Sequence, residues 1–146
     1  MLGEKIILGT KEVSMDEKGR MIIPSFAYPT PDEEVVFTVE DKESFYISSL
    51  EMLKNTLINL KNERYSTINS QKIFEIERRI EQIYKTAIDI AQIDKNARII
   101  VPKFIRSEII FVNDETQKST NLIAQGNGYR LKYYINKNAY YNSLVK

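Results

Sequence analysis

The sequence contains no cysteine and no histidine. Thiolate and imidazole ligands are therefore missing, as are the thiol nucleophile and the usual general base at neutral pH. Zinc sites built on those ligands and Ser-His or Cys-His catalysis are excluded, and we expect no metal and no cofactor. Without cysteine there is no disulfide framework, which makes a reducing cytoplasm the natural compartment.

Glycine and proline are also scarce, with 5 and 4 residues, and no long linker stands out. With 42% hydrophobic and 28% charged residues, the composition is that of a globular protein with one core, or with two small units that share one. The opening residues 1–8 carry both an acidic and a basic side chain and lack a long apolar run. We therefore expect neither a signal peptide nor a membrane span.

The net charge of +1 hides a segregation of charge along the chain. Residues 1–94 hold 12 Lys and Arg against 17 Asp and Glu, whereas residues 95–146 hold 9 against 3. Because affinity for nucleic acid rests mainly on neutralising phosphates, the basic second part is the better candidate for such a surface. The alternative explanation is a chance difference in charge between two surfaces of the protein.

An internal repeat organises the chain. Residues 13–26 align without gaps on residues 91–104, and residues 45–47 echo residues 133–135 after a longer connection. Five aligned pairs are identical: Asp16 and Asp94, Arg20 and Arg98, Ile22 and Ile100, Pro24 and Pro102, and Phe26 and Phe104. The pattern indicates that one unit has been duplicated.

Each copy is typical of a β-hairpin followed by a strand. Residues 16–19 form a polar corner in which Gly19 is free to take the positive φ of a tight turn. The run 21–23 predicts a strand buried on both faces, which Pro24 ends because it has no N–H. In the second copy we expect Asn96 to supply the left-handed residue.

A second hairpin follows in each copy. Residues 35–39 and 44–47 flank an acidic turn, and residues 121–124 and 129–133 flank a glycine-containing turn. Both are expected to be antiparallel.

Two helices are predicted between the copies, with apolar stripes that serve as packing surfaces. The first opens with a capping box made by Ser48 and Glu51, and the second runs from about Ser70 to Ile88. The predicted organisation is a first repeat with its helix over 1–60, a connecting helix over 61–90 and a second repeat over 91–146.

The repeat resembles the MraZ family. Leu8-Gly9, Asp16, Lys18-Gly19-Arg20 and Ile22-Ile23-Pro24 are similar to its first block, and Asp94, Arg98, Val101-Pro102 and Arg106 are similar to its second. Tyr28 stands where the first block commonly carries an arginine, and Ala97 replaces a glycine. The resemblance implies an α+β fold in which two tandem AbrB-type hairpin units form a swapped-hairpin barrel. It also implies a bacterial transcriptional regulator of the division and cell-wall genes that binds repeated promoter DNA as a ring of subunits.

The candidate DNA-binding residues follow from the corners. Arginine can bridge phosphates or read guanine with its planar fork, which favours Arg20 and Arg98. Nearby basic side chains are expected to contact phosphates and fix position without reading sequence: Lys18, Lys95, Lys103 and Arg106. Asp16, Gly19 and Asp94 are assigned to the turn structure. A local ion pair between each arginine and its aspartate is the alternative, and we favour a mixture of both roles.

Two further clusters of residues are better explained by solubility or packing than by a function. The acidic residues 32–34, with Glu40, Asp41 and Glu43, suggest metal binding or carboxylate chemistry, but charge that keeps exposed edges soluble is favoured. On that interpretation they lie away from the DNA face. The tyrosines at 129, 133, 134, 140 and 141 suggest stacking on single-stranded bases, but packing at alternating strand positions is favoured.

The sequence therefore predicts a cytoplasmic, nucleoid-associated protein without enzymatic activity. Its expected partners are double-stranded DNA and further copies of itself, with no membrane and no small-molecule substrate. Two other classes stay open: an antitoxin-like or structural module that binds a protein partner, and an enzyme built on the paired carboxylates.

Overall fold

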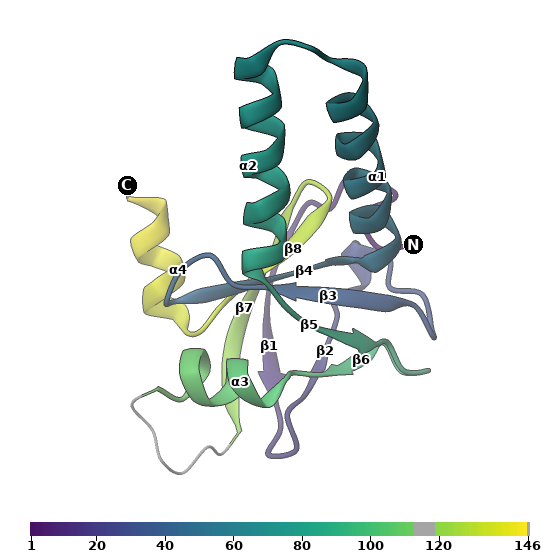
Figure 1. The fold of residues 1–146 in the computed structure, drawn as a ribbon. Coiled ribbons are helices and arrows are strands. Elements are labelled where there is room, and N and C mark those ends of the chain that lie inside the picture. The colour runs from purple at the N-terminus through teal and green to yellow at the C-terminus, as the bar shows by residue number, and fades with distance from the viewer. Residues whose placement is uncertain (113–118, 146) are drawn as a thin grey trace.

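The fold is an α+β barrel, and the computed structural model describes residues 1–112 and 119–145 of the chain. Within these residues, eight strands pair antiparallel in one sheet that curls into a nearly closed barrel (Figure 1). The strands are β1 (Thr10–Met15), β2 (Arg20–Ile22), β3 (Glu34–Thr38), β4 (Ser44–Ser49), β5 (Ala87–Gln92), β6 (Arg98–Ile100), β7 (Thr120–Asn127) and β8 (Arg130–Tyr134). The helices are α1 (Leu50–Ser66), α2 (Ser70–Thr86), α3 (Lys103–Ile105) and α4 (Lys137–Leu144), with a 3-10 turn over Ser25–Ala27 and a π-helical turn over Arg106–Ile110. The predicted α+β class and barrel are confirmed at this level.

The strand order interleaves the two halves of the chain. Across the sheet the order is β5, β3, β4, β8, β7, β1, β2, β6, so β1 lies against β7 and β2 lies against β6. The two end strands, β5 and β6, follow each other in the chain. The corner that joins them holds a hydrogen bond in which the Asp94 N–H donates to the Arg98 carbonyl at 2.8 Å.

The two antiparallel hairpins expected from the sequence are confirmed. They are the pair β3 and β4 and the pair β7 and β8. The sheet draws strands from both predicted repeats, and α1 continues across residue 60.

Alternating strand residues point into the barrel and form one apolar core. Fully buried side chains include those of Met15, Met21, Phe37, Phe45, Ile99 and Tyr133. Each such side chain stabilises the fold by about 1.5–3 kcal/mol relative to full exposure. The rings of Phe45 and Tyr133 stack with centroids 5.2 Å apart, and burial raises the pKa of the Tyr133 hydroxyl.

The outer surface of β2 differs from the prediction. Met21 and Ile23 are buried, but Ile22 is 48% exposed because it faces outward between them. A strand buried on both faces was therefore the wrong expectation. The C-terminal tyrosines, expected at alternating strand positions, lie in different elements. Tyr133 and Tyr134 are buried on β8, whereas Tyr140 and Tyr141 lie on α4 and not on a strand.

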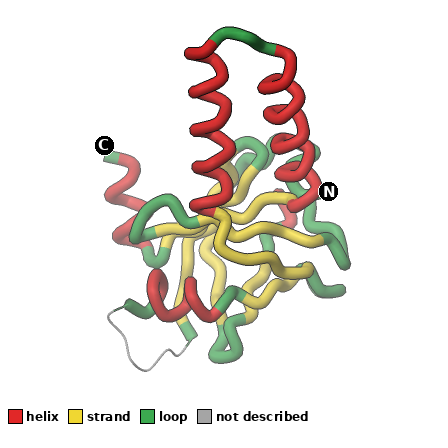
Figure 2. The backbone as a smooth tube through the Cα atoms, viewed as in Figure 1, coloured by secondary structure: helices red, strands yellow, loops and turns green. Residues whose placement is uncertain are grey.

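The helices α1 and α2 form a hairpin that projects from the outer face of the barrel (Figures 1 and 2). Only Leu60 and Ile76 are buried in it, so the leucine and isoleucine stripes pack incompletely. The helix cap is Ser49, whose side chain accepts from the Met52 N–H at 3.3 Å, and not Ser48 as predicted. The helix α2 ends at Thr86, two residues before the predicted end, because residues 87–92 pair with β3.

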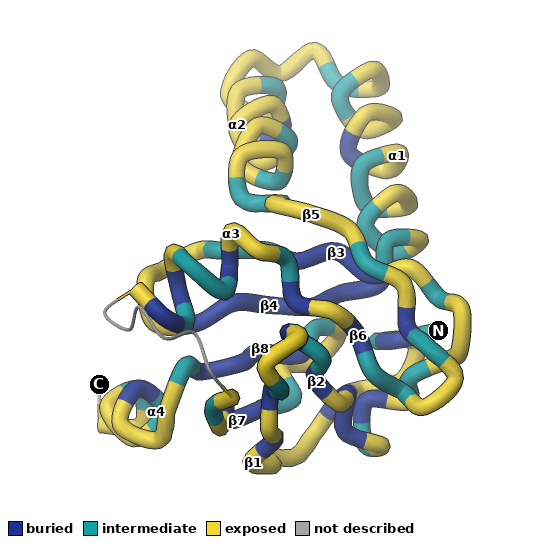
Figure 3. The backbone as a smooth tube through the Cα atoms, turned by 90° about the horizontal axis from the view of Figure 1, so that it is seen from below, coloured by how far each residue is buried: buried dark blue, intermediate teal, exposed yellow. Residues whose placement is uncertain are grey.

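Exposure differs among the strands of the barrel. Figure 3 shows β3 and β4 as buried along most of their length, while much of β5 is exposed. Of the helices in residues 1–112 and 119–145, none is long and apolar enough to cross a membrane.

Candidate nucleic-acid interface

The first corner, residues 16–20, is organised by one carboxylate. Asp16 Oδ1 accepts the backbone N–H of Lys18 at 3.0 Å and that of Arg20 at 2.9 Å. Asp16 Oδ2 accepts the Arg20 Nε at 2.7 Å. Gly19 has a φ of 82°, a conformation that glycine adopts without a steric cost.

The second corner, residues 94–98, repeats these hydrogen bonds. Asp94 Oδ1 accepts the backbone N–H groups of Asn96 and Arg98 at 2.8 and 2.9 Å, and Oδ2 accepts the Arg98 Nε at 3.1 Å. The left-handed residue is Ala97, with a φ of 59°, and not Asn96 as predicted. The backbone position equivalent to Gly19 takes this conformation even though the residue there has a side chain.

Hydrogen bonding favours the ionised form of both aspartates. The Arg20 backbone N–H, and then its side chain, lower the pKa of Asp16, and the Arg98 backbone N–H does the same for Asp94. The side chain of Arg20 is still 39% exposed and that of Arg98 is 34% exposed. Because only Nε is bound to the aspartate within the described residues, the outer guanidinium nitrogens remain available as donors.

The two corners meet on one outward face through β2 and β6. These strands pair Arg20 with Ile100, Met21 with Ile99, and Ile22 with Arg98. Since Met21 and Ile99 point inward, the flanking pairs point outward and place two arginines and two isoleucines side by side. Strand geometry puts the Cα atoms of the two arginines about 8 Å apart, which spans between two and three base steps of about 3.4 Å.

Each corner is completed by the other copy. The Val101 N–H donates to the Gly19 carbonyl and the Ile23 N–H donates to the Ala97 carbonyl, both at 2.8 Å. The same crossing places Arg106 over Gly19, where an added Cβ would lie 2.9 Å from the Arg106 Cδ. Arg106 Nε is buried and has no hydrogen-bond partner within the described residues. The first corner therefore holds Lys18, Arg20 and Arg106 together.

The remaining candidates are more dispersed. Lys95 lies exposed in the second corner, and Lys103 lies exposed at the start of α3. The position equivalent to Arg106 is Tyr28, which is 50% exposed and carries Lys5 Nζ 5.0 Å from its ring centroid.

Part of the acidic cluster lies beside the second corner. The Asp32 N–H donates to the Ile93 carbonyl at 2.8 Å, and the Ile93 N–H donates to the Glu33 carbonyl at 2.9 Å. Since Ile93 directly precedes Asp94, the backbone of Asp32 and Glu33 lies beside the second corner. Glu40 and Asp41 instead pair with Arg130 at 2.6 Å and Lys132 at 3.9 Å. No group of three or more acidic side chains in the described residues is arranged to hold a metal ion.

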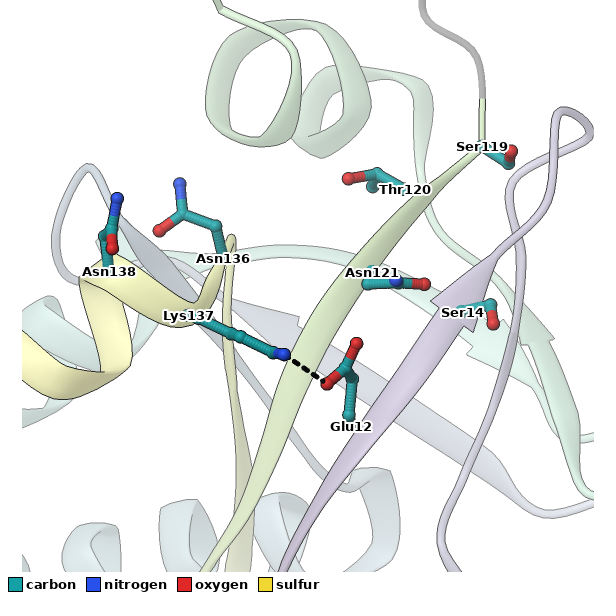
Figure 4. A pocket seen from close by; sticks show the side chains of 8 residues that line it. All are labelled: Glu12, Ser14, Ser119, Thr120, Asn121, Asn136, Lys137 and Asn138. Carbon is teal, nitrogen blue, oxygen red and sulfur yellow. Dashed lines mark ion pairs between the residues drawn. The ribbon is translucent and has the colours of Figure 1, made fainter.

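Sequence reasoning missed a groove lined by polar side chains (Figure 4). It lies between β1, β7 and the start of α4, with a volume of about 670 Å³. Its lining residues are Glu12, Ser14, Ser119, Thr120, Asn121, Asn136, Lys137 and Asn138. Lys137 Nζ lies 3.3 Å from Glu12 Oε2, which offsets that acidic charge. The pairing of β1 with β7, which brings these residues together, leaves no local signal in the sequence.

Comparison with known proteins adds little to this geometry. No protein-family model matches the chain, and no curated protein matches it. Among solved structures, the solution structure of PHS018 from Pyrococcus horikoshii is similar over 88% of both chains, with 12% identity and a TM-score of 0.30.

Proposed function

We propose that this chain is a sequence-specific double-stranded DNA-binding regulator of transcription, similar to the MraZ family. The observation that carries the proposal is the outward face of β2 and β6, where Arg20 and Arg98 are each held by an ionised aspartate. A guanidinium fixed through Nε presents its two outer nitrogens in one plane, which suits the O6 and N7 acceptors of guanine. Lys18 and Arg106 beside the first corner supply phosphate contacts.

The finer architecture belongs to the same proposal. The chain would consist of two tandem AbrB-type hairpin units in a swapped-hairpin barrel, supported by the repeated hydrogen bonds at 16–20 and 94–98. Several such chains would form a ring that presents its corners to repeated promoter elements, which turns weak contacts into avidity. Light scattering should give a higher oligomer at micromolar concentration, and a strict monomer would contradict the ring.

The DNA-binding proposal is tested by fluorescence anisotropy with a labelled duplex from upstream of the chain's own gene. We expect saturable binding that is tighter than to a scrambled duplex of the same composition and that weakens steeply as salt rises. The double variant Arg20→Ala, Arg98→Ala should bind neither duplex specifically. The control is Arg78→Ala, an exposed arginine on α2 away from the corners (Figure 1).

A second candidate is a protein-interaction module of the antitoxin-like or structural kind. The observation that favours it is apolar exposure: Ile22 and Ile100, on the outward face of β2 and β6, are 48% and 59% exposed, and Phe104 on α3 is 51% exposed. A folded protein that binds no duplex at low salt would favour this second function over the first.

A further inference from the structure

A cavity lies at the root of the helical hairpin, where α1 and α2 meet the outer face of the barrel. Its volume is about 460 Å³, within the range of roughly 300–1,000 Å³ that small-molecule sites occupy. Its walls come from β3, β4, both helices and the turn before β8. Apolar side chains line part of it: Met52, Leu53, Ile83, Ala87 and Tyr129.

The cavity exists because the hairpin packs tightly only farther from the barrel. Leu60 on α1 and Ile76 on α2 are 8% and 5% exposed, so the two apolar stripes meet there. Nearer the barrel, Leu53 and Ile83 lie on the same stripes but are only half-buried. They line the cavity instead of burying each other, which leaves room for an apolar group between them.

The charged lining favours one negative charge on a ligand. Glu40, Arg130 and Arg79 line the cavity, and Arg130 Nη1 donates to Glu40 Oε2 at 2.6 Å. Arg130 Nε is buried without a hydrogen-bond partner, and its guanidinium lies 3.8 Å from the ring centroid of Tyr46. Arg79 makes no ion pair within the described residues. One glutamate against two arginines leaves a net positive charge at the rim.

The cavity also offers uncharged hydrogen-bond donors. Ser48, Gln82 and Thr38 also line the cavity, and their side chains donate no hydrogen bond within the described residues. Ser48 is 7% exposed, so its hydroxyl faces little solvent other than the cavity. An acid group that enters the cavity therefore meets both a cation and neutral donors.

We propose that this cavity binds a small amphipathic monoanion, with its apolar body between Leu53 and Ile83 and its carboxylate or sulfonate at Arg79. The proposal does not depend on DNA binding. It adds a ligand class to a face of the molecule that the corners do not use.

The test uses two fluorescent probes that differ mainly in charge. 1-Anilinonaphthalene-8-sulfonate carries one sulfonate, and N-phenyl-1-naphthylamine has a similar aromatic body without it. Each is titrated into the full chain without DNA, and we expect one saturable site for both. Arg79→Ala should weaken the sulfonate about fivefold, the upper range for a partly exposed ion pair, and leave the neutral probe unchanged. Arg78→Ala, one residue away and outside the cavity, should change neither.

Cavity filling separates this site from general apolar stickiness. Thr56→Trp and Gln82→Trp place an indole in the cavity from opposite helices and should each weaken both probes at least tenfold. Asn59→Trp, exposed on α1 and outside the lining, is the matched control. Circular dichroism checks folding, and Gln82→Trp decides the result where Thr56→Trp does not fold. Absence of saturable binding, binding that survives cavity filling, or equal effects of Arg79→Ala and Arg78→Ala would each overturn the proposal.

Discussion

The first and second corners have the same skeleton and different surroundings. In both, one aspartate accepts two backbone N–H groups and the Nε of the arginine four residues on. The first corner lies under Arg106, whereas the second lies beside Asp32 and Glu33. The hydrogen bonds are local and therefore repeat with the sequence. The charge around each corner comes from the opposite half of the chain and does not repeat.

The comparison also shows where backbone strain is tolerated. Gly19 and Ala97 hold equivalent positions with φ values of 82° and 59°. An alanine in the left-handed region costs about 1 kcal/mol relative to glycine. The second corner keeps its hydrogen bonds despite this cost, so the aspartate and the pairing with β2 determine its shape more than the turn residue does.

The largest expected effect separates the two arginines. Arg20→Ala should weaken specific duplex binding by about 1–3 kcal/mol, roughly a fivefold to more than hundredfold loss, because it removes the proposed bidentate base contact. Arg98→Ala should cost less, since the second corner has acidic residues beside it and a tyrosine, Tyr28, at the position equivalent to Arg106. Anisotropy titrations at one salt concentration measure both. An Arg20→Ala protein that binds normally but melts earlier would make this arginine a purely structural partner of Asp16.

A smaller effect is expected from the residue that distinguishes the corners. Arg106→Ala should weaken binding about fivefold on every sequence and reduce the salt slope by about 1, because it removes the proposed phosphate contact. Tyr28→Arg places an arginine at the equivalent position of the first copy and should strengthen binding. The slopes come from titrations at several salt concentrations. A loss for Arg106→Ala that depends on base sequence would contradict the phosphate role.

Exchanging the turn residues tests the strain. Gly19→Ala should destabilise the fold by about 1–2 kcal/mol, because the side chain adopts positive φ and displaces Arg106. Ala97→Gly should change stability in the opposite direction, by at most about 1 kcal/mol, since the relief is partly offset by the freedom glycine gains in the unfolded chain. Urea unfolding measures both. Loss of stability in Ala97→Gly would show that the second corner is unstrained.

The smallest effect concerns pH. Because the pKa values of Asp16 and Asp94 are lowered in the folded state, their stabilisation is present above their unfolded pKa near 3.8 and is lost as pH falls through the folded values. Asp16→Asn should lower the melting temperature by a few degrees at neutral pH and by less in strong acid. Asp94→Asn should behave alike. Melting curves measured from pH 7 downward decide this, and an equal shift at every pH would argue against the ionised carboxylate.

Local features of the fold could be predicted from the sequence, whereas contacts between the halves could not. The corner at Asp16 and the hairpin of residues 34–49 depend on neighbours in the chain, and both were predicted. The exposure of Ile22 and the placement of Arg106 over Gly19 depend on the pairing of β2 with β6, which joins residues almost 80 positions apart. Hydrophobic alternation identifies a strand but does not name its partner.

The candidate site shows the same division. The arginines and aspartates were found from the repeat, and their ion pairs follow from a spacing of four residues. The polar groove of Figure 4 and the cavity under the hairpin form where elements distant in the sequence meet. No sequence motif therefore predicts them. The cap at Ser49 was missed because two adjacent serines offer equivalent caps, and only the position of the last strand residue decides between them.

The interleaved sheet has a consequence for chain connectivity. The turn at residues 67–69 lies at the tip of the hairpin, with Ile68 fully exposed, and β1 to β4 precede it while β5 to β8 follow it. A cut at this tip would leave every strand intact but divide the barrel between two fragments whose hairpins alternate around it. Each fragment holds only separate strand pairs that are not neighbours in the sheet. Each fragment would therefore need the strands of the other to form the barrel. The covalent link through the tip therefore acts mainly by keeping two mutually dependent halves at high local concentration.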